Sequence, residues 1–246
     1  MHRFFIKPEQ VTNLNVHFDD EQAHQMRRVL RLCPSDRVLA LDGGGQEFEV
    51  ILEEVSPSRV TGLVVRQSAA DGEPAVRLTL YQSLLKREKF EWVLQKGTEI
   101  GVTRFVPVIT IRSLVRETEH VKPEKLERWQ RIIKEAAEQS GRGILPQLIS
   151  PVPFTFAAAE GLGHDCAVLA WEEATKPGIR AAMRRCESAN DIGLYIGPEG
   201  GFDGNEIEEA AFYGVIPVTL GRRILRTETA AIVAAAIVLH ERGEMG

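Results

Sequence analysis

Two glycine-bearing segments near the C-terminus constrain this 246-residue chain more than any other feature. One reads Ile-Gly-Pro-Glu-Gly-Gly-Phe over 196–202, and the other reads Leu-Gly-Arg-Arg-Ile-Leu-Arg-Thr-Glu-Thr-Ala over 220–230. Each segment follows a short apolar run typical of a strand and precedes a helical pattern. Glycine lets backbone N–H and C=O groups approach a flat small molecule that side chains would keep away. The pair therefore predicts a ligand site at the ends of two neighbouring strands.

Strand-like runs and helical patterns alternate through the second part of the chain. The runs lie at 76–80, 105–110, 166–171, 192–196 and 215–220, and the helical patterns lie at 89–100, 123–141, 177–186, 204–213 and 227–242. This alternation indicates an α/β fold with a parallel sheet and helices on both faces. Ligands of such sheets bind beside the carboxyl ends of the strands. The loops after Trp171, Ile196 and Leu220 all follow such ends, so we expect them to meet around one site.

The first 70 residues have a different, mostly β pattern. Strands are expected at 37–41, 46–55 and 59–66, a tight turn at 42–45, and one helix at about 20–32 after a cap at Asp19 or Asp20. A small, polar segment with Gly and Pro at 68–75 is typical of a linker. We therefore expect a small β domain over 1–70 and an α/β domain over 71–246.

Charge and cysteine content narrow the class of protein. The formal net charge of −5 argues, taken alone, against a nucleic-acid-binding protein. Two basic clusters nevertheless occur, each of which could equally be a solvated helix face: Arg27, Arg28, Arg31 and Arg37, and then Lys86, Arg87, Lys89 and Lys96. Three scattered cysteines predict a reducing compartment without disulfides.

We expect a cytoplasmic protein with no membrane partner, because the apolar run at 230–239 is too short to span a bilayer. No histidine pair has a metal-ligand setting, so no metal is expected.

The two C-terminal segments carry a resemblance to a known family. GPEGGF and LGxRILRxETA resemble motifs of the RsmE-like ribosomal RNA methyltransferases, which belong to the SPOUT class. Upstream stretches at 24–32 (HQMRRVLRL), 95–102 (QKGTEIGV) and 135–142 (EAAEQSGR) fit the same resemblance. The resemblance implies a C-terminal trefoil knot, a PUA-like or OB-like RNA-binding barrel at the N-terminus, and homodimers. Nothing in the composition or periodicity shows a knot.

The resemblance also implies S-adenosylmethionine as the methyl donor. An adenine ring needs an apolar wall with backbone donors and acceptors at its edge. The candidate cofactor-binding residues are Leu169, Ala170, Trp171, Glu172, Ile196, Gly197, Pro198, Glu199, Gly200, Gly201, Leu220, Gly221, Arg223, Ile224, Leu225, Thr229 and Ala230. The alternative is that these are core residues with turn glycines, which the pairing of the two motifs disfavours.

The acceptor that the resemblance implies is N3 of a uridine in 16S ribosomal RNA. This nitrogen carries a proton at neutral pH, so a base must remove it or cations must stabilise the deprotonated base. Glu199 and Glu228 are the candidate bases, and Arg223 and Arg226 are the candidate stabilisers. Glu199 could instead be a solvated turn residue or face the sulfonium. Glu228 could instead be a first-turn carboxylate favoured by the helix dipole.

Candidate RNA-binding residues lie outside these motifs. They are His24, Arg27, Arg28, Arg31, Arg112, Ser113, Gln139, Ser140 and Arg142. The last three could instead form a polar helix end before a glycine stop. The expected partners are 16S ribosomal RNA or the small ribosomal subunit, and a second copy of the chain, since residues 230–239 are apolar all round. Another acceptor, such as a ribose 2′-hydroxyl, and a non-catalytic RNA-binding module remain the alternative functions.

Overall fold

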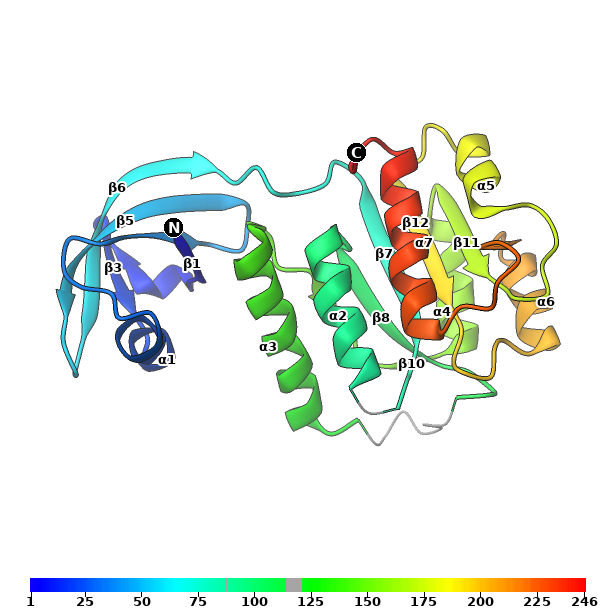
Figure 1. The fold of residues 1–246 in the computed structure, drawn as a ribbon, viewed down its shortest axis with the longest axis horizontal. Helices are drawn as coiled ribbons and strands as arrows, with labels where there is room; N and C mark the ends of the chain where they lie inside the picture. The colour runs from blue at the N-terminus through cyan, green and yellow to red at the C-terminus, as the bar shows by residue number, and fades with distance from the viewer. Residues whose placement is uncertain (87, 114–120) are drawn as a thin grey trace. The chain divides into compact units, whose positions relative to one another are not determined.

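The computed structural model describes residues 1–86, 88–113 and 121–246 (Figure 1). Arg87 of the second basic cluster lies outside the described residues. The chain forms two compact units. The first contains residues 1–73 and 137–145, and the second contains 74–136 and 146–246. Residues 137–145 thus belong with a unit whose other residues lie far from them in the sequence.

The first unit is built on a six-stranded sheet. Its order is β1 (His2–Phe5), β4 (Arg37–Leu41), β5 (Gln46–Val55), β6 (Val60–Ala69), β3 (Asn15–Phe18) and β2 (Val11–Thr12), with the short helix η1 (Pro8–Gln10) beside it. The β1–β4 ladder is parallel and the others are antiparallel. Phe4, Met26, Val38 and Val50 are buried in its core. A small β domain is therefore present, whereas closure into a barrel stays a prediction.

The helix of the first unit is shorter than the sequence pattern predicted. It comprises α1 (Asp20–His24) and a π-helical turn, η2 (Gln25–Val29). Asp19 caps it, because its carboxylate accepts from the backbone N–H of Gln22 at 2.8 Å. The prediction that the helix reaches residue 32 is wrong. Arg31 adopts a φ of 55°, and the N–H of Leu32 bonds back to the Met26 carbonyl, so the chain turns away.

The second unit contains a seven-stranded sheet in which every ladder is parallel, as predicted. The order is β10 (Val152–Pro153), β8 (Arg104–Ile109), β7 (Arg77–Ser83), β12 (Asp191–Ile196), β11 (Cys166–Ala170) and β13 (Ile216–Val218), with β9 (Gln147–Leu148) paired to β8. The central strands are rich in buried aliphatic residues because helices cover both faces of the sheet.

The helices of the second unit divide between the two faces of the sheet. One apolar cluster takes in α2 (Lys89–Ile100), α3 (Pro123–Ser140), α5 (Ile179–Arg185) and α7 (Thr227–Glu241). The other takes in α4 (Phe154–Ala159), next to η4 (Glu160–Gly163), and α6 (Gly204–Phe212). Figure 1 shows α2 and α7 side by side on one face. Within the described residues, no helix has the length and apolar character needed to cross a membrane.

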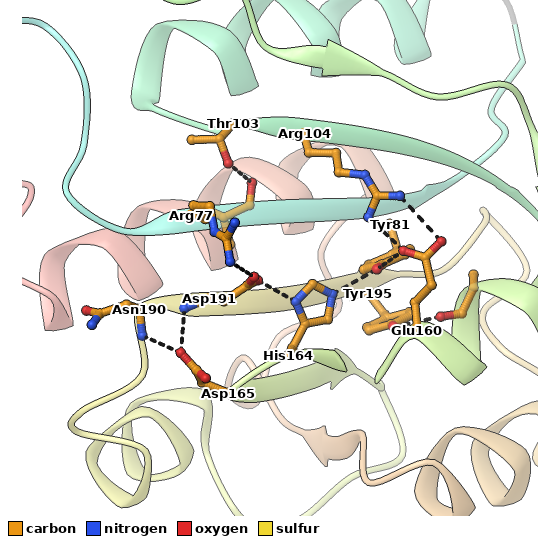
Figure 2. A network of polar contacts seen from close by, with 12 residues as sticks. Arg77, Tyr81, Thr103, Arg104, Glu160, His164, Asp165, Asn190, Asp191 and Tyr195 are labelled. Carbon is orange, nitrogen blue, oxygen red and sulfur yellow. Dashed lines mark hydrogen bonds and ion pairs between the residues drawn. The ribbon is translucent and has the colours of Figure 1, made fainter. Parts of the chain in front are cut away.

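A polar network joins Tyr81, within β7, to residues at the amino-terminal ends of β8, β11 and β12 (Figure 2). Tyr81 donates a hydrogen bond to Glu160 at 2.7 Å and lies 2.8 Å from His164, whose Nδ1 lies 2.6 Å from Asp191. Arg104 pairs with Glu160 at 2.6 Å. Burial raises the pKa of the Tyr81 hydroxyl, so Tyr81 stays protonated and keeps donating. The network therefore links central strands of the sheet away from their carboxyl ends, where a ligand site is expected.

Candidate active site

A cavity of about 680 Å³ lies at the carboxyl ends of β11, β12 and β13. Fifteen of the predicted site residues line it: Ala170, Trp171, Glu172, Ile196, Gly197, Pro198, Glu199, Gly201, Leu220, Gly221, Arg223, Ile224, Leu225, Arg226 and Ala230. The two glycine segments therefore meet, together with the loop after β11, around one space. The volume is within the range of small-molecule sites, roughly 300–1,000 Å³.

Other predicted residues lie beside this cavity and do not line it. Leu169 is fully buried behind the wall, and Thr229 is exposed on α7. Gly200 lies against the side chain of Arg112, and Glu228 contacts the cavity residue Lys89. Six lining residues were not predicted: Lys89, Ala174, Thr175, Thr219, Arg222 and Thr227. Lys89 could have been found, because it begins the helix that follows the carboxyl end of β7.

Hydrogen bonds lock the three segments around the cavity. The Trp171 N–H donates to the Val218 carbonyl at 3.0 Å, which joins the loops after β11 and β13. The Thr227 hydroxyl donates to the Gly197 carbonyl and accepts from the Gln82 amide at 3.2 Å. The first residue of α7 thus holds the glycine turn after β12 to the end of β7. Hydrogen bonds within one chain therefore hold the walls of the cavity together.

Glycine is required where the turn after β12 passes Glu172. Gly201 has a φ of 71°, and a Cβ there would lie 1.9 Å from the Glu172 carboxylate. Only glycine adopts such a φ without strain and leaves this space open. The neighbouring Pro198 carbonyl accepts from the Gly201 N–H at 3.1 Å and completes the turn. The approach of this backbone to a bound ligand stays a prediction.

Charged side chains gather at one side of the cavity. The Lys89 ammonium lies 3.6 Å from Glu199 Oε1 and 3.4 Å from Glu228 Oε2. The Glu228 side chain is 16% exposed and that of Glu199 is 27% exposed. Arg223 and Arg226, on the loop between β13 and α7, are exposed. The cavity therefore presents a cation between two carboxylates, with further cations at its rim.

Two predicted RNA contacts in the second unit have structural partners. Arg112 donates to the Gly200 carbonyl at 3.1 Å and to Asp203 at 3.2 Å, so it clamps the glycine turn. Ser113 is buried, with its hydroxyl 2.7 Å from that of Thr110. The Arg112 side chain therefore holds the glycine turn beside the cavity. Because Ser113 is buried, its position does not favour the expected RNA contact.

The remaining predicted RNA contacts belong to the first unit. His24, Arg28, Arg31 and Gln139 are exposed, whereas Arg27 and Ser140 are partly buried. Arg27 donates to the Pro57 carbonyl at 3.2 Å. Arg142 is buried and pairs with Glu73 at 2.7 Å. This position favours a role inside the first unit over the predicted contact with RNA.

Comparisons with known proteins agree with this geometry. The model of the RNA methyltransferase domain family matches residues 72–239. A ribosomal RNA small subunit methyltransferase E from a Synechocystis species is 36% identical over 96% of this chain and 76% of its own length. The chain belongs to the ribosomal RNA small subunit methyltransferase E family. The resemblance inferred from the glycine motifs is thereby confirmed.

Solved structures of related proteins share the fold. A family member from Neisseria gonorrhoeae, bound to S-adenosyl methionine, is 30% identical with a TM-score of 0.85, and the match covers 98% of this chain and 97% of that one. A methyltransferase from Legionella pneumophila, in complex with the cofactor SAM, is 29% identical with a TM-score of 0.88, covering 97% of this chain and 96% of that one. The similarity therefore extends over both units.

Proposed function

We propose that this protein uses S-adenosylmethionine to methylate N3 of a uridine in 16S ribosomal RNA. The observation that carries the proposal is the convergence of two glycine segments on one cavity at the carboxyl ends of parallel strands. Family membership and the cofactor named in the related structures support it. S-adenosylmethionine, when bound, supplies a methyl group activated on a cationic sulfonium.

The residues of the cavity fit this cofactor. Ala170, Ile196 and Leu225 offer apolar surface, and Gly197 and Gly201 bring backbone close to the space. The carboxylates of Glu172 and Glu199 line the same cavity and complement a positive charge. The members of the sequence-derived cofactor site that line the cavity are therefore proposed to bind the cofactor, with Thr219 and Thr227 added.

The chain's contribution to methyl transfer is chiefly orientation. Transfer between two bound groups needs them at near-attack distance, which positioning by the protein supplies. The locked turn at Gly197 and the Thr227 hydrogen bonds give the cavity a fixed shape. Arg223 and Arg226 are exposed at its rim, where we propose that they contact phosphates of the RNA.

We further propose that the first unit binds RNA as a PUA-like barrel. The exposed Arg28 and Arg31 and the partly buried Arg27 form a local positive patch on an acidic protein, which supports this role. The proposed substrate is a ribosomal component, so we expect the protein to act in the cytoplasm.

A trefoil knot and a homodimer are also proposed. The return of the chain from the edge strand β13 to α7, which packs on the central strands β7 and β12, supports the knot. On α7, Val233 stays 37% exposed, and Ile224 in the preceding loop is 79% exposed. These apolar side chains support a second copy packing beside the cavity.

Two measurements test the proposed function. Isothermal titration should show one S-adenosylmethionine site per chain, and no binding would leave only an RNA-binding module. A strain that lacks the gene should lose one 3-methyluridine from its 16S ribosomal RNA, measured by mass spectrometry of nucleosides. Loss of a ribose-methylated nucleoside in its place would assign a different acceptor.

A further inference from the structure

Among the described residues, the Lys89 side chain makes ion pairs in the cavity but no hydrogen bond. Its ammonium is 3.4 Å from Glu228 and 3.6 Å from Glu199, and within the described residues these two ion pairs are its polar contacts. The side chain is 38% exposed and lines the cavity. An ammonium has three N–H donors, so Lys89 retains donors for a bound group.

Glu228 depends on Lys89. Its Oε2 is buried and makes no hydrogen bond with any described residue, and Lys89 is its ion-pair partner. Glu228 itself does not line the cavity, whereas Glu199 and Lys89 do. The carboxylate of Glu228 therefore lies behind the ammonium and holds it toward the space. Removing Lys89 leaves the buried Glu228 Oε2 without its ion-pair partner, so the two positions are coupled.

We propose that Lys89 is a catalytic residue that donates a hydrogen bond to a carbonyl oxygen of the acceptor base, that Glu228 positions it, and that Glu199 accepts the N3 proton. This assignment rests on the proposed function. The imide edge of uracil presents an N–H flanked by carbonyl oxygens. A carboxylate and an ammonium next to each other in the same cavity match a neighbouring N–H and C=O on that edge.

The step balances without a further reactant. The N3 proton passes to the Glu199 carboxylate, and the negative charge left on the base spreads onto its carbonyl oxygens, where Lys89 stabilises it. The N3 electron pair then forms a bond to the methyl carbon. The bond from that carbon to sulfur breaks, and its electron pair stays on the sulfur as a neutral thioether. Glu199 finally releases its proton to solvent.

The structure divides roles that the sequence left open. Glu199 and Glu228 were equal candidates for the base, and the cavity separates them because only Glu199 lines it. Lys89 also suits the cationic role near the reacting edge, since an ammonium is a compact point charge. The planar guanidinium groups of Arg223 and Arg226 match phosphates better.

The test compares Lys89→Ala, Glu228→Gln and the double variant. Lys89→Ala should lower kcat on the small subunit by about 10²-fold, the effect of removing one donor from a developing negative charge. Its KM for RNA and its Kd for S-adenosylmethionine, measured by titration, should not change. Added propylamine should restore part of the rate, because the free amine can occupy the emptied space. A purely structural role predicts no such rescue.

The double variant tests the positioning role. If Glu228 acts through Lys89, Lys89→Ala with Glu228→Gln should be no slower than Lys89→Ala alone. The double variant also removes the unpaired buried charge, so it protects the test if Lys89→Ala folds poorly. Lys96→Ala is the matched control, because Lys96 lies on the same helix and pairs with Glu99 at 2.7 Å, away from the cavity.

Three results would overturn the assignment. An unchanged kcat in Lys89→Ala would make Lys89 a surface ion pair, and additive losses in the double variant would separate Glu228 from it. If the parent protein itself yields no 3-methyluridine, the proposed function fails and the assignment fails with it. This outcome can be told apart from the other two because it is measured on the unmutated protein, whereas they are measured on variants.

Discussion

Replacing Gly201 by alanine should weaken cofactor binding and leave the fold intact. At a φ of 71° an alanine is strained by about 1–2 kcal/mol. Its Cβ would also lie 1.9 Å from Glu172 Oε1 and 2.8 Å from Glu172 Cδ. The end of a glutamate side chain can swing aside at little cost to stability. The clash therefore displaces Glu172 from the cavity without unfolding the protein.

Gly214 supplies the control that separates strain from clash. It has a similar φ of 78°, but an added Cβ meets no atom within 4 Å. Both alanine variants should lose a similar free energy of unfolding, on the order of 1–2 kcal/mol, in urea denaturation. Only Gly201→Ala should weaken S-adenosylmethionine binding in a titration, by more than about tenfold, or about 1.4 kcal/mol. Equal affinities in the two variants would refute the proposal that this turn and Glu172 form part of the cofactor site.

Three further predictions concern other parts of the molecule. Changing Arg27, Arg28 and Arg31 to alanine should weaken RNA binding and reduce its salt slope by up to about 3, with cofactor affinity unchanged; an unaltered salt series would make the patch a solvated helix face. Burial works to raise the pKa of Glu160, but hydrogen bonds from Arg104 and Tyr81 outweigh it and leave that pKa lowered. Glu160 therefore stabilises the fold above the ordinary carboxyl pKa and loses this effect as pH falls through the lowered value, so Glu160→Gln should flatten the acid side of the stability profile measured by urea denaturation. Light scattering at micromolar concentration should give the mass of a dimer, and a monomer would contradict the proposed partner face.

The parallel sheet and its helices could be predicted because their signals are local. The bounds 89–100 predicted for α2 are those observed, since Gly101 ends the helix at a φ of 111°. The helical pattern predicted from 204 likewise begins where α6 begins, because the capping box Asp203-x-x-Glu206 is a local signal and both of its reciprocal hydrogen bonds are present. The glycine segments predicted the site for the same reason, since a turn of this kind is encoded within a few residues.

Features set by distant contacts could not be predicted. Strands β9 and β10 have two residues each and are defined by their pairing with β8. A segment this short has no hydrophobic periodicity from which a strand could be predicted. The burial of Arg142 depends on Glu73, almost seventy positions earlier in the chain. The ion pairs of Lys89 also depend on distant residues, although its place at the start of the helix after β7 is a local signal. Its carboxylate partners come from the turn after β12 and from α7.

The central claim is tested most directly by transfer of a labelled methyl group. Small ribosomal subunits from a strain that lacks the gene would be incubated with the protein and S-adenosylmethionine carrying a deuterated methyl group. The ribosomal RNA would then be digested to nucleosides and analysed by mass spectrometry. The proposed function predicts that the label appears in 3-methyluridine alone. Label in a ribose-methylated nucleoside, or no label in any nucleoside, would contradict it.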